Sequence, residues 1–457
     1  MKKIKFFVAL YAAKSTQLLM KLLGRNATYL PGKVAVKICR DFLAHLTPPK
    51  TVIAVTGTNG KTTVSNLIAS ILSDNGFSVT NNSFGSNVQA GVISALIADS
   101  KLSGKPKKDI AVLEVDERSS LLIYPYLAPD FLICNNIMRD SLKRNAHTEF
   151  IRYIIDSALP KTTKLVLNAD DLNAAILGSS GQEKIFFGIE ADIPDTNEQQ
   201  YIRDIVYCPV CGESLVADYV RYNHIGRHHC SSCTLRSPAP SYSVTMINRE
   251  KNEFTVSSSH GEMTFNLIND NIVNIYNFVA VVSILDLIGL SADQIAKGFS
   301  ATKIVKTRLD EIVIGEYKVT MLMAKGQNPI ACARCYDYVA KAAGDEKGVI
   351  ILVDDKDDNI ENSESTCWLY DCDYRALADP SINQIVFAGP RCKDHYLRAM
   401  MAGVDKEKIK IVPASSQGAE LFDIARSNNI YVLHELYRPA DAAVVKNTLI
   451  ERIKGMV

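Results

Sequence analysis

The sequence predicts an α/β protein with a parallel-sheet central domain and a separate C-terminal α/β domain. Apolar runs alternate with helical patterns from residue 49 to residue 305, and the alternation starts again near residue 306. A glycine-rich segment at residues 56–63 connects an apolar run to a helical pattern, and a cysteine-rich insert at residues 205–238 interrupts the first region. We therefore expect an N-terminal helical segment over 1–48, a central domain over 49–305 and a C-terminal domain over 306–457.

Length and composition indicate a globular protein of several domains. At 457 residues the chain is too long for one core, and 47% of its residues are hydrophobic. Its net charge of +1 argues against a nucleic-acid partner. Four of the eleven cysteines form two pairs with metal-binding spacing and the rest are scattered, which favours a reducing, cytoplasmic location.

The first residues imitate a signal peptide, with a basic start and a short apolar stretch. Lys14 interrupts this stretch, and Leu18, Leu19, Leu22 and Leu23 continue it at helical spacing. We expect a helix that packs against the next domain; a helix lying on the inner face of the membrane is the alternative. Because no uninterrupted run of about 20 apolar residues occurs, no transmembrane segment is predicted.

The segment from Thr56 to Thr63 has the order of a phosphate-binding site, since it follows the apolar run Val52–Val55 and precedes a helical pattern. In such a loop, backbone N–H groups surround phosphate oxygens, a lysine neutralises charge and a threonine hydroxyl reaches Mg²⁺. The candidate ATP-binding residues are Gly57, Thr58, Asn59, Gly60, Lys61, Thr62 and Thr63. A glycine turn without a ligand is the alternative, but it gives no reason for the lysine–threonine pair.

Carboxylates gather at the end of another predicted strand, which covers residues 110–115. Glu114 lies in this run, and Asp116 and Glu117 follow it. Neighbouring carboxylates repel one another without a cation, so we expect Mg²⁺ here with Thr62 and Glu114 as ligands. A solvated acidic loop is the alternative.

Two C-x-x-C pairs separated by eighteen residues stand in the insert. The spacing of Cys208 and Cys211 from Cys230 and Cys233 is typical of a zinc ribbon. Because four thiolates complete a tetrahedron, we expect a structural Zn²⁺. A redox dithiol is the alternative, but it does not explain two matched pairs. The histidines of the insert are then expected at the surface or beside the ligands: His224, His228 and His229.

The phosphate loop, T-G-T-N-G-K-T-T, resembles that of the Mur ligases, which join an amino acid to a cell-wall precursor through an acyl phosphate. It lacks the first glycine of the common G-x-x-x-x-G-K-[ST] pattern, where Val55 stands. The resemblance implies a Mur-ligase-like fold for the central domain, with Lys61 and Glu114 acting in catalysis. It also implies that Asn277 contacts the adenine and that Arg308 meets phosphate at the domain junction. A helix N-cap role is the alternative for Asn277.

The ribbon insert and the C-terminal segment T-C-W-L-Y-D at residues 366–371 narrow the resemblance to one branch of that family. Both are similar to features of the MurT subunits of lipid II isoglutaminyl synthase. The resemblance implies ATP-dependent amidation of the α-carboxyl of D-glutamate in the lipid II stem peptide, a step of peptidoglycan biosynthesis. A GatD-type glutaminase subunit, paired with the ligase subunit in a heterodimer, would supply the ammonia.

The family also has an aspartate, three residues before the tryptophan, that completes the catalytic triad of the glutaminase. Counting back from Trp368, this place falls on Ser365, and a serine lacks the fixed negative charge that orients a triad histidine. Asp371 is the candidate that remains after the tryptophan. A shifted loop could instead supply one of four acidic residues: Asp357, Asp358, Glu361 or Glu364.

Two other functions remain open at this point. The chain could be a Mur-type or folylpolyglutamate-type ligase that adds an amino acid to another carboxylate, although those families do not require the ribbon. It could also be a scaffold that binds ATP and a partner without turnover, which the replaced aspartate favours. The nature of the incorporated group separates the first alternative from amidation, and the effect of removing Lys61 on turnover separates the second.

Overall fold

The computed structural model describes residues 2–83, 86–140, 145, 147–190, 193, 204–301, 309–324, 326, 328–353, 366–435 and 439–456. The predicted site residues Arg308 and Ser365, with the acidic alternatives at 357, 358, 361 and 364, lie outside this part of the chain. Contacts divide the chain into two compact units. The first contains residues 1–138, 147–198 and 203–304, and the second contains 139–146, 199–202 and 305–457.

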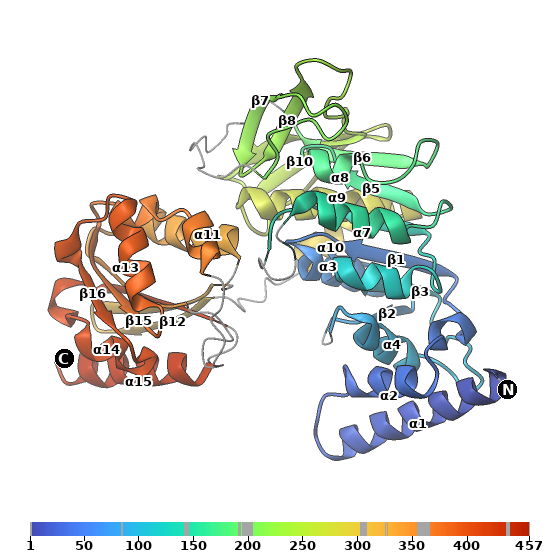
Figure 1. Ribbon diagram of the computed structural model, residues 1–457, viewed down its shortest axis with the longest axis horizontal. Coiled ribbons are helices and arrows are strands. Elements are labelled where there is room, and N and C mark those ends of the chain that lie inside the picture. Colours follow the sequence, from blue (N-terminus) through green and yellow to red (C-terminus); the bar gives the residue numbers. More distant parts are fainter. Residues whose placement is uncertain are drawn as a thin grey trace. The chain divides into compact units, whose positions relative to one another are not determined.

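The first unit is organised around a nine-stranded sheet in the described chain, with the order β11-β10-β9-β6-β5-β4-β1-β3-β2 (Figure 1). Pairing is parallel from β2 to β9 and antiparallel between β9, β10 and β11. The strands are β1 Thr51–Thr56, β2 Val79–Asn81, β3 Ile110–Glu114, β4 Phe131–Cys134, β5 Lys164–Asn168, β6 Lys184–Ile189, β9 Tyr242–Asn248, β10 Glu253–Ser258 and β11 Gly261–Asn266.

Helices cover both faces of this sheet because its central strands are apolar on both sides. Alternate residues Val52 and Ala54 of β1 join the core cluster shared with α1, α2, α4 and α7, while Ile53 and Val55 are buried on the other face. The contacts of α3 with α9 and α10 place those three helices together. The helices are α1 Lys2–Leu22, α2 Leu30–Ile38, α3 Lys61–Asp74, α4 Gln89–Ala98, α5 Ser120–Ile123, α7 Thr148–Ala158, α8 Leu172–Ala175, α9 Ile272–Ile288 and α10 Ala292–Ala301.

A separate hairpin of β7 (Leu215–Tyr222) and β8 (Ile225–Cys230) forms the cysteine-rich insert (Figure 1). Asn223, at the hairpin turn, has a φ of 50°, and asparagine is one of the residues that tolerates this left-handed conformation. Single bridges join Tyr207 to Ser214 and His229 to Arg236 beside the hairpin. They bring the two C-x-x-C segments together at one end of it.

The second unit contains a six-stranded sheet in its described part, ordered β12-β13-β17-β14-β15-β16, with one antiparallel edge pair, β12–β13. Two core clusters, one on each face, fill the space between sheet and helices. The strands are β12 Leu309–Ile314, β13 Tyr317–Met323, β14 Lys347–Leu352, β15 Ile382–Ala388, β16 Ile409–Val412 and β17 Asn429–His434. The helices are α11 Pro329–Lys341, α12 Cys367–Asp371, α13 Cys392–Met401, α14 Gly418–Leu421 and α15 Pro439–Lys454.

The predicted fold class, with a parallel central sheet and a separate C-terminal α/β domain, is confirmed. The apolar runs at 110–115, 131–135, 165–168 and 185–188 correspond to β3, β4, β5 and β6. The N-terminal helix packs against the central domain, as expected, through contacts with α2 and α4. No described helix is long and apolar enough to cross a membrane.

Gly32 allows α2 to approach α4 closely, which gives a test of this packing. A Cβ atom at residue 32 would lie 1.9 Å from the backbone oxygen of Ala90, which cannot move aside easily. We expect Gly32→Ala to lower the free energy of unfolding by about 2 kcal/mol or more, measured by urea denaturation. Lys33→Ala changes an exposed residue of the same helix and is the control. Equal stability of the two variants would contradict the close approach.

Candidate nucleotide and metal sites

The glycine-rich loop after β1 needs its glycines for both conformation and space. Gly57 and Gly60 have φ values of 117° and 89°, which favour glycine. A Cβ atom at Gly57 would lie 2.8 Å from the Asn136 carbonyl oxygen, and one at Gly60 would lie 2.1 Å from Asn277 Oδ1. Helix α3 begins at Lys61 without a side-chain cap and without an acidic residue in its first turn. This N-terminus suits an anion such as a phosphate group.

The segment that follows β4 holds the loop in place. The Thr58 amide donates to the Asn136 carbonyl oxygen at 2.8 Å, and its hydroxyl donates to the Met138 carbonyl oxygen at 3.0 Å. Asn136 also uses its side chain, since Oδ1 accepts from the Asn59 amide and Nδ2 donates to the Asn59 carbonyl oxygen. The loop is therefore braced by its neighbouring strand end and is preorganised.

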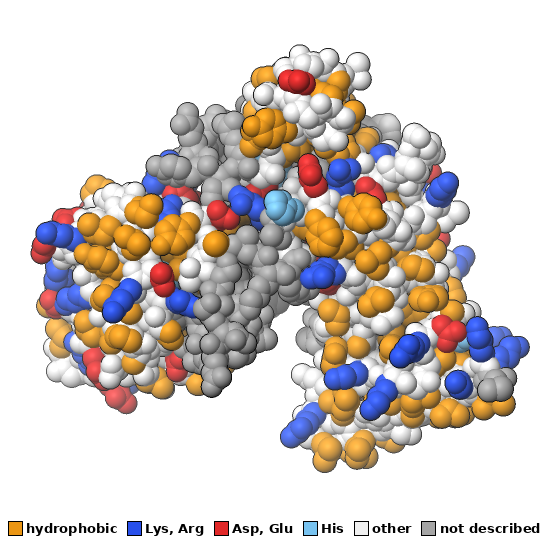
Figure 2. Space-filling view, viewed as in Figure 1, with side chains coloured by type: hydrophobic (Ala, Val, Ile, Leu, Met, Phe, Trp, Pro, Cys, Tyr) orange, Lys and Arg blue, Asp and Glu red, His pale blue; other side chains and the backbone are white. Residues whose placement is uncertain are grey.

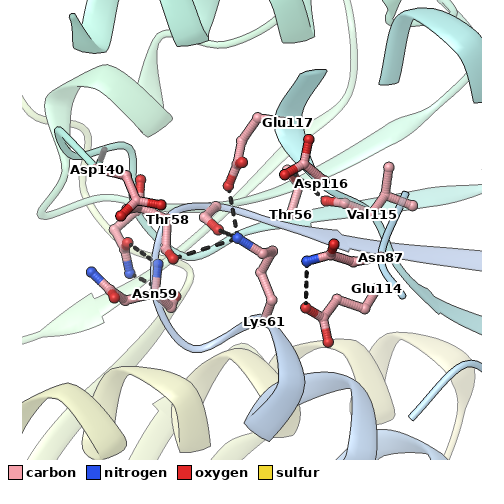
Figure 3. Close-up of polar contacts among 12 residues, drawn as sticks. Thr56, Thr58, Asn59, Lys61, Asn87, Glu114, Val115, Asp116, Glu117 and Asp140 are labelled. Atoms are coloured by element: carbon pink, nitrogen blue, oxygen red, sulfur yellow. Dashed lines mark hydrogen bonds and ion pairs between the residues drawn. The ribbon is translucent and has the colours of Figure 1, made fainter. Parts of the chain in front are cut away.

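Lys61 points back over the loop toward a group of carboxylates (Figure 3). Its Nζ donates to Glu117 Oε1 at 2.9 Å and to the Gly57 carbonyl oxygen at 2.5 Å. Burial opposes protonation of Lys61, but Glu117, followed by Glu114 and Asp116, raises its pKa above the ordinary value. Lys61 is therefore a cation near neutral pH and can stabilise phosphoryl oxygens.

Glu114 lies at the C-terminal end of β3, beside the first turn of α3. Its Oε2 accepts from the Thr62 hydroxyl at 2.8 Å. Its Oε1 accepts from Asn87 Nδ2 at 3.0 Å (Figure 3). Asn82 fixes the backbone of Glu114, accepting from its amide and donating to its carbonyl oxygen. The expected neighbours Thr62 and Glu114 thus lie together, and the carboxylate is oriented from both sides.

The donor set around Glu114 fits a divalent cation. Glu114, Asp116 and Glu117 are all buried, and Lys61 is the ammonium that faces this group. Gathering several carboxylates in a buried place is costly unless positive charge lies close to them. Mg²⁺ prefers hard oxygen ligands, such as the Thr62 hydroxyl and the Glu114 carboxylate, together with nucleotide phosphates.

Asn277 lies in the second turn of α9 and contacts the loop region. Its Oδ1 accepts from Asn135 Nδ2 at 2.8 Å, and it is 2% exposed. The N-cap of α9 is Asn271, whose side chain accepts from the Val273 amide. The N-cap alternative for Asn277 is therefore wrong, because the helix begins at Ile272, five residues before Asn277.

The four cysteines of the insert converge on one point. Their Sγ atoms all lie within 4.8 Å of one another, with 3.6 Å between Cys208 and Cys233 and 3.4 Å between Cys211 and Cys230. A zinc ion with Zn–S bonds of about 2.3 Å has S···S edges of about 3.8 Å, so the cluster is close to the required size. Backbone amides of Ser232 and Cys233 donate to Cys230 Sγ and lower the pKa of that thiol to about 6. The sulfur set fits a tetrahedral metal ion.

An ion pair and a buried histidine–aspartate contact attach this insert to the central sheet. The Arg227 Nε donates to Asp170 Oδ1 at 3.2 Å, and His224 Nε2 lies 3.1 Å from Asp171 Oδ1 with both side chains fully buried. The expectation of His224 at the surface or beside the zinc ligands is therefore wrong. Burial, and then Asp170, raise the pKa of Tyr276, which donates its hydroxyl hydrogen to Asp170 at 2.7 Å. Tyr276 precedes Asn277, so these contacts reach the loop region.

The C-terminal tryptophan motif forms the short helix α12 of the second unit. Trp368 is 2% exposed and packs edge-on against His395, with 6.2 Å between the ring centroids. At the end of α12, Asp371 Oδ2 accepts from Arg139 Nη1 at 2.9 Å, and both side chains are about a quarter exposed. Asp371 is thus held in an ion pair, in the same short helix as the buried Trp368.

Comparison with known protein families agrees with this geometry. A family model described as Mur ligase middle domain matches residues 55–231, and one described as MurT ligase C-terminal matches residues 326–437. The chain carries a Mur ligase middle domain and a MurT ligase C-terminal domain. This confirms both parts of the family recognition from the sequence.

Curated relatives share this combination along most of their length. The chain is 29% identical to the lipid II isoglutaminyl synthase (glutamine-hydrolyzing) subunit MurT of Staphylococcus aureus (strain COL), covering 87% of this chain and 88% of the relative. It is 26% identical to the MurT subunit of Streptococcus pneumoniae (strain ATCC BAA-255 / R6), covering 94% of each chain.

Solved structures show the same fold at lower sequence identity. A pseudomurein peptide ligase type C from Methanothermus fervidus superposes with a TM-score of 0.65 at 20% identity, covering 91% of this chain and 81% of the other. MurF from Acinetobacter baumannii superposes with a TM-score of 0.62 at 16% identity, covering 92% of this chain and 80% of the other.

Sequence reasoning missed two parts of the site. The ion pair of Lys61 with Glu117 was not predicted, although Glu117 stands just after the β3 run. Asn87, which orients Glu114, gave no signal, because it lies in the connection between β2 and α4.

The Gly60 geometry predicts a selective loss of nucleotide binding. In Gly60→Ala the added Cβ would clash with Asn277 Oδ1, whereas at Gly76, which has a similar φ of 84°, no atom lies within 4 Å. Both variants place alanine in a left-handed conformation, so both lose some stability. We expect Gly60→Ala to bind Mg·ATP at least about 100-fold more weakly by calorimetry, since displaced loop amides lose several phosphate hydrogen bonds. Unchanged binding in Gly60→Ala, or an equal loss in Gly76→Ala, would contradict this geometry.

Proposed function

We propose that the chain is the ligase subunit of a lipid II isoglutaminyl synthase. It is an ATP-dependent carbon–nitrogen ligase that converts the α-carboxyl of D-glutamate in the lipid II stem peptide into an amide. The observation that carries the proposal is the pairing of Thr62 with Glu114 beside the glycine-rich loop, in a chain that also has a MurT ligase C-terminal domain. The MurT relatives, named as lipid II isoglutaminyl synthase subunits, support the choice of acceptor. The proposed domain boundaries are 48/49 and 305/306, with the insert at 205–238.

The first chemical step activates a poor electrophile. A carboxylate oxygen of the acceptor attacks the γ-phosphorus of ATP, and the bond to the β,γ-bridging oxygen breaks, which gives an acyl phosphate and ADP. The loop amides at Gly57–Lys61 and the start of α3 bind the phosphates, while Asn277 and Arg308 contact the nucleotide. Lys61 exchanges Glu117 for phosphoryl oxygens and stabilises their charge. Bound Mg²⁺ on Thr62 and Glu114 would add further positive charge at the transferring phosphoryl group.

The second step forms the carbon–nitrogen bond. Ammonia attacks the carbonyl carbon of the acyl phosphate, the C–O bond to phosphate breaks, and phosphate leaves with the bonding electrons. Loss of a proton from nitrogen completes the amide. A GatD-type glutaminase partner supplies the ammonia. Asp371, the last residue of the T-C-W-L-Y-D segment, is the residue we propose to complete the catalytic triad of that partner. Ammonium salts can replace the partner, so the ligase half of the reaction is testable alone.

We also propose that Cys208, Cys211, Cys230 and Cys233 hold one structural Zn²⁺. The closely spaced sulfur atoms and the amide hydrogen bonds to Cys230 support this site. The β7–β8 hairpin has a small core of its own, so a metal ion would supply part of its folding free energy.

Metal analysis of purified protein tests the zinc site. We expect one zinc per chain by inductively coupled plasma mass spectrometry, and its loss in Cys208→Ser because three thiolates bind far more weakly than four. Cys367→Ser removes an exposed cysteine of α12 and is the control that should keep its zinc. Metal-free protein of unchanged thermal stability would contradict the structural role.

The amidation itself is tested by mass spectrometry of lipid II after incubation with protein, ATP, Mg²⁺ and ammonium, without a glutaminase. We expect the D-glutamate carboxyl to become an amide, and only when ATP is present. Glu114→Gln should lower kcat by about 100-fold, because it removes the charge that holds the cation. Glu183→Gln, at an exposed ion pair with Lys164, is the control that should keep full activity.

Two outcomes would redirect the assignment. Incorporation of an amino acid in place of ammonia would indicate a Mur-type or folylpolyglutamate-type ligase. ATP binding without turnover, unaffected by Lys61→Ala, would indicate a scaffold.

A further inference from the structure

Helix α1 has two apolar faces. One face, with Phe6, Ala9, Leu10 and Ala13, is buried in the core shared with α2 and α4. The opposite face is exposed, from 48% at Tyr11 to 76% at Leu22, and its apolar residues follow helical spacing except at Ser15. We call it the outer stripe, and it consists of Ile4, Val8, Tyr11, Leu18, Leu19 and Leu22.

An outer face of this kind is unusual for a helix that packs on one side only. Such a helix normally presents polar side chains to water on its far side. Single exposed apolar residues are common, but a row of them along one helix marks an interaction surface. The outer stripe therefore indicates a partner.

The charge around the outer stripe identifies the chemistry of that partner. Residues 1–40 contain nine Lys and Arg and neither Asp nor Glu, although the whole chain is almost balanced at 51 to 50. Lys2, Lys3 and Lys5, near the start of α1, are exposed. In Figure 2, Lys and Arg side chains gather over the region of α1 and α2, with hydrophobic side chains along its lower edge. The partner is apolar in its interior and negatively charged at its surface.

We propose that the outer stripe docks on the surface of an anionic phospholipid bilayer, with the helix axis in the plane of the membrane. The apolar side chains enter the boundary of the acyl region, and the lysines reach the lipid phosphates. Tyr11 and Tyr29, which are 48% and 43% exposed, suit the interfacial layer because each combines a ring with a polar hydroxyl. One face of α1 thus packs on the central domain, as expected from the sequence. The opposite face is the one we propose to lie on a membrane, which was the alternative.

A second copy of the chain fits this surface poorly. A symmetric dimer through the outer stripe would bring two identical sets of nine cations together, with no carboxylate among residues 1–40 to compensate them. A bilayer with anionic head groups supplies both the apolar interior and the negative charge.

Docking also bears on the active site, and this point rests on the proposed function. The inner side of α1 lines a cavity of about 200 Å³ with Gln17 and Lys21, opposite Asn81 and Asn82. Asn82 is the residue that holds the backbone of Glu114. A chain of contacts within the first unit thus connects α1 to the backbone of the catalytic carboxylate.

Vesicle flotation with the full-length protein tests the docking without ATP or acceptor, so its outcome does not depend on the ligase reaction. We expect binding to vesicles of phosphatidylcholine and phosphatidylglycerol in equal parts, and little binding to phosphatidylcholine alone. The double variant Leu19→Gln/Leu22→Gln keeps the charge but removes two apolar contacts, and should bind at least about tenfold more weakly. Lys2→Gln/Lys3→Gln/Lys5→Gln should weaken binding and reduce its salt dependence.

The control is Leu397→Gln/Met401→Gln, which changes two exposed residues, 50% and 64%, of α13 in the second unit. It should bind as the unaltered protein does, and thermal unfolding should be unchanged in every variant. No vesicle binding, or equal binding by Leu19→Gln/Leu22→Gln, would overturn the proposal. The proposal would also be overturned if the protein formed a dimer in lipid-free solution, or captured an acidic protein, and Leu19→Gln/Leu22→Gln abolished that association.

Discussion

A cluster of three buried carboxylates beside the Lys61 ammonium sets the main constraint on the active region. Glu114, Asp116 and Glu117 gather where β3 ends, and Lys61 approaches them from the start of α3. Such a group is stable only with additional positive charge or with close hydrogen bonding, and the structure supplies the second through Thr62 and Asn87. A cluster of carboxylates favours a divalent cation, and a cation there would in turn attract nucleotide phosphates. The loop conformation, the N-terminus of α3 and the position of the carboxylates all suit the binding of a divalent cation together with phosphate groups.

Polar contacts extend from this region in two directions. On one side, Asn136 at the end of β4 hydrogen-bonds to the loop, and Asn277 of α9 lies close to Gly60, so the loop is braced before any ligand binds. On the other, the contacts of Asp170 and Asp171 with Arg227 and His224 attach the cysteine-rich insert to the same edge of the sheet. Paired and fully hydrogen-bonded ions tolerate burial, but they need every partner in place. Contacts of the insert thus extend through Asp170 to Tyr276, which is next to Asn277.

The sequence predicted those parts of the site whose position follows from the order of elements along the chain. A strand, a glycine loop and a helix follow one another along the chain, and parallel strands end at the same edge of a sheet, so Thr62 and Glu114 were expected to meet. The contribution of Asn87 depends on the folded path of an irregular connection and left no periodic pattern. His224 was expected at the surface or beside the zinc ligands because a polar insert usually stays in water, yet the hairpin folds back onto Asp171. The outer face of α1 shows the same limit, since leucines at helical spacing do not reveal which face is buried.

Transfer of oxygen from the acceptor to phosphate tests the central claim, carboxyl activation at this site, most directly. Lipid II labelled with ¹⁸O in the D-glutamate α-carboxyl would be incubated with the protein, ATP, Mg²⁺ and ammonium, and the released phosphate analysed by mass spectrometry. An acyl phosphate pathway transfers one labelled oxygen to phosphate for each amide formed, because the C–O bond of the former carboxylate breaks. Amide formation with unlabelled phosphate, or phosphate release without any amide, would contradict the account.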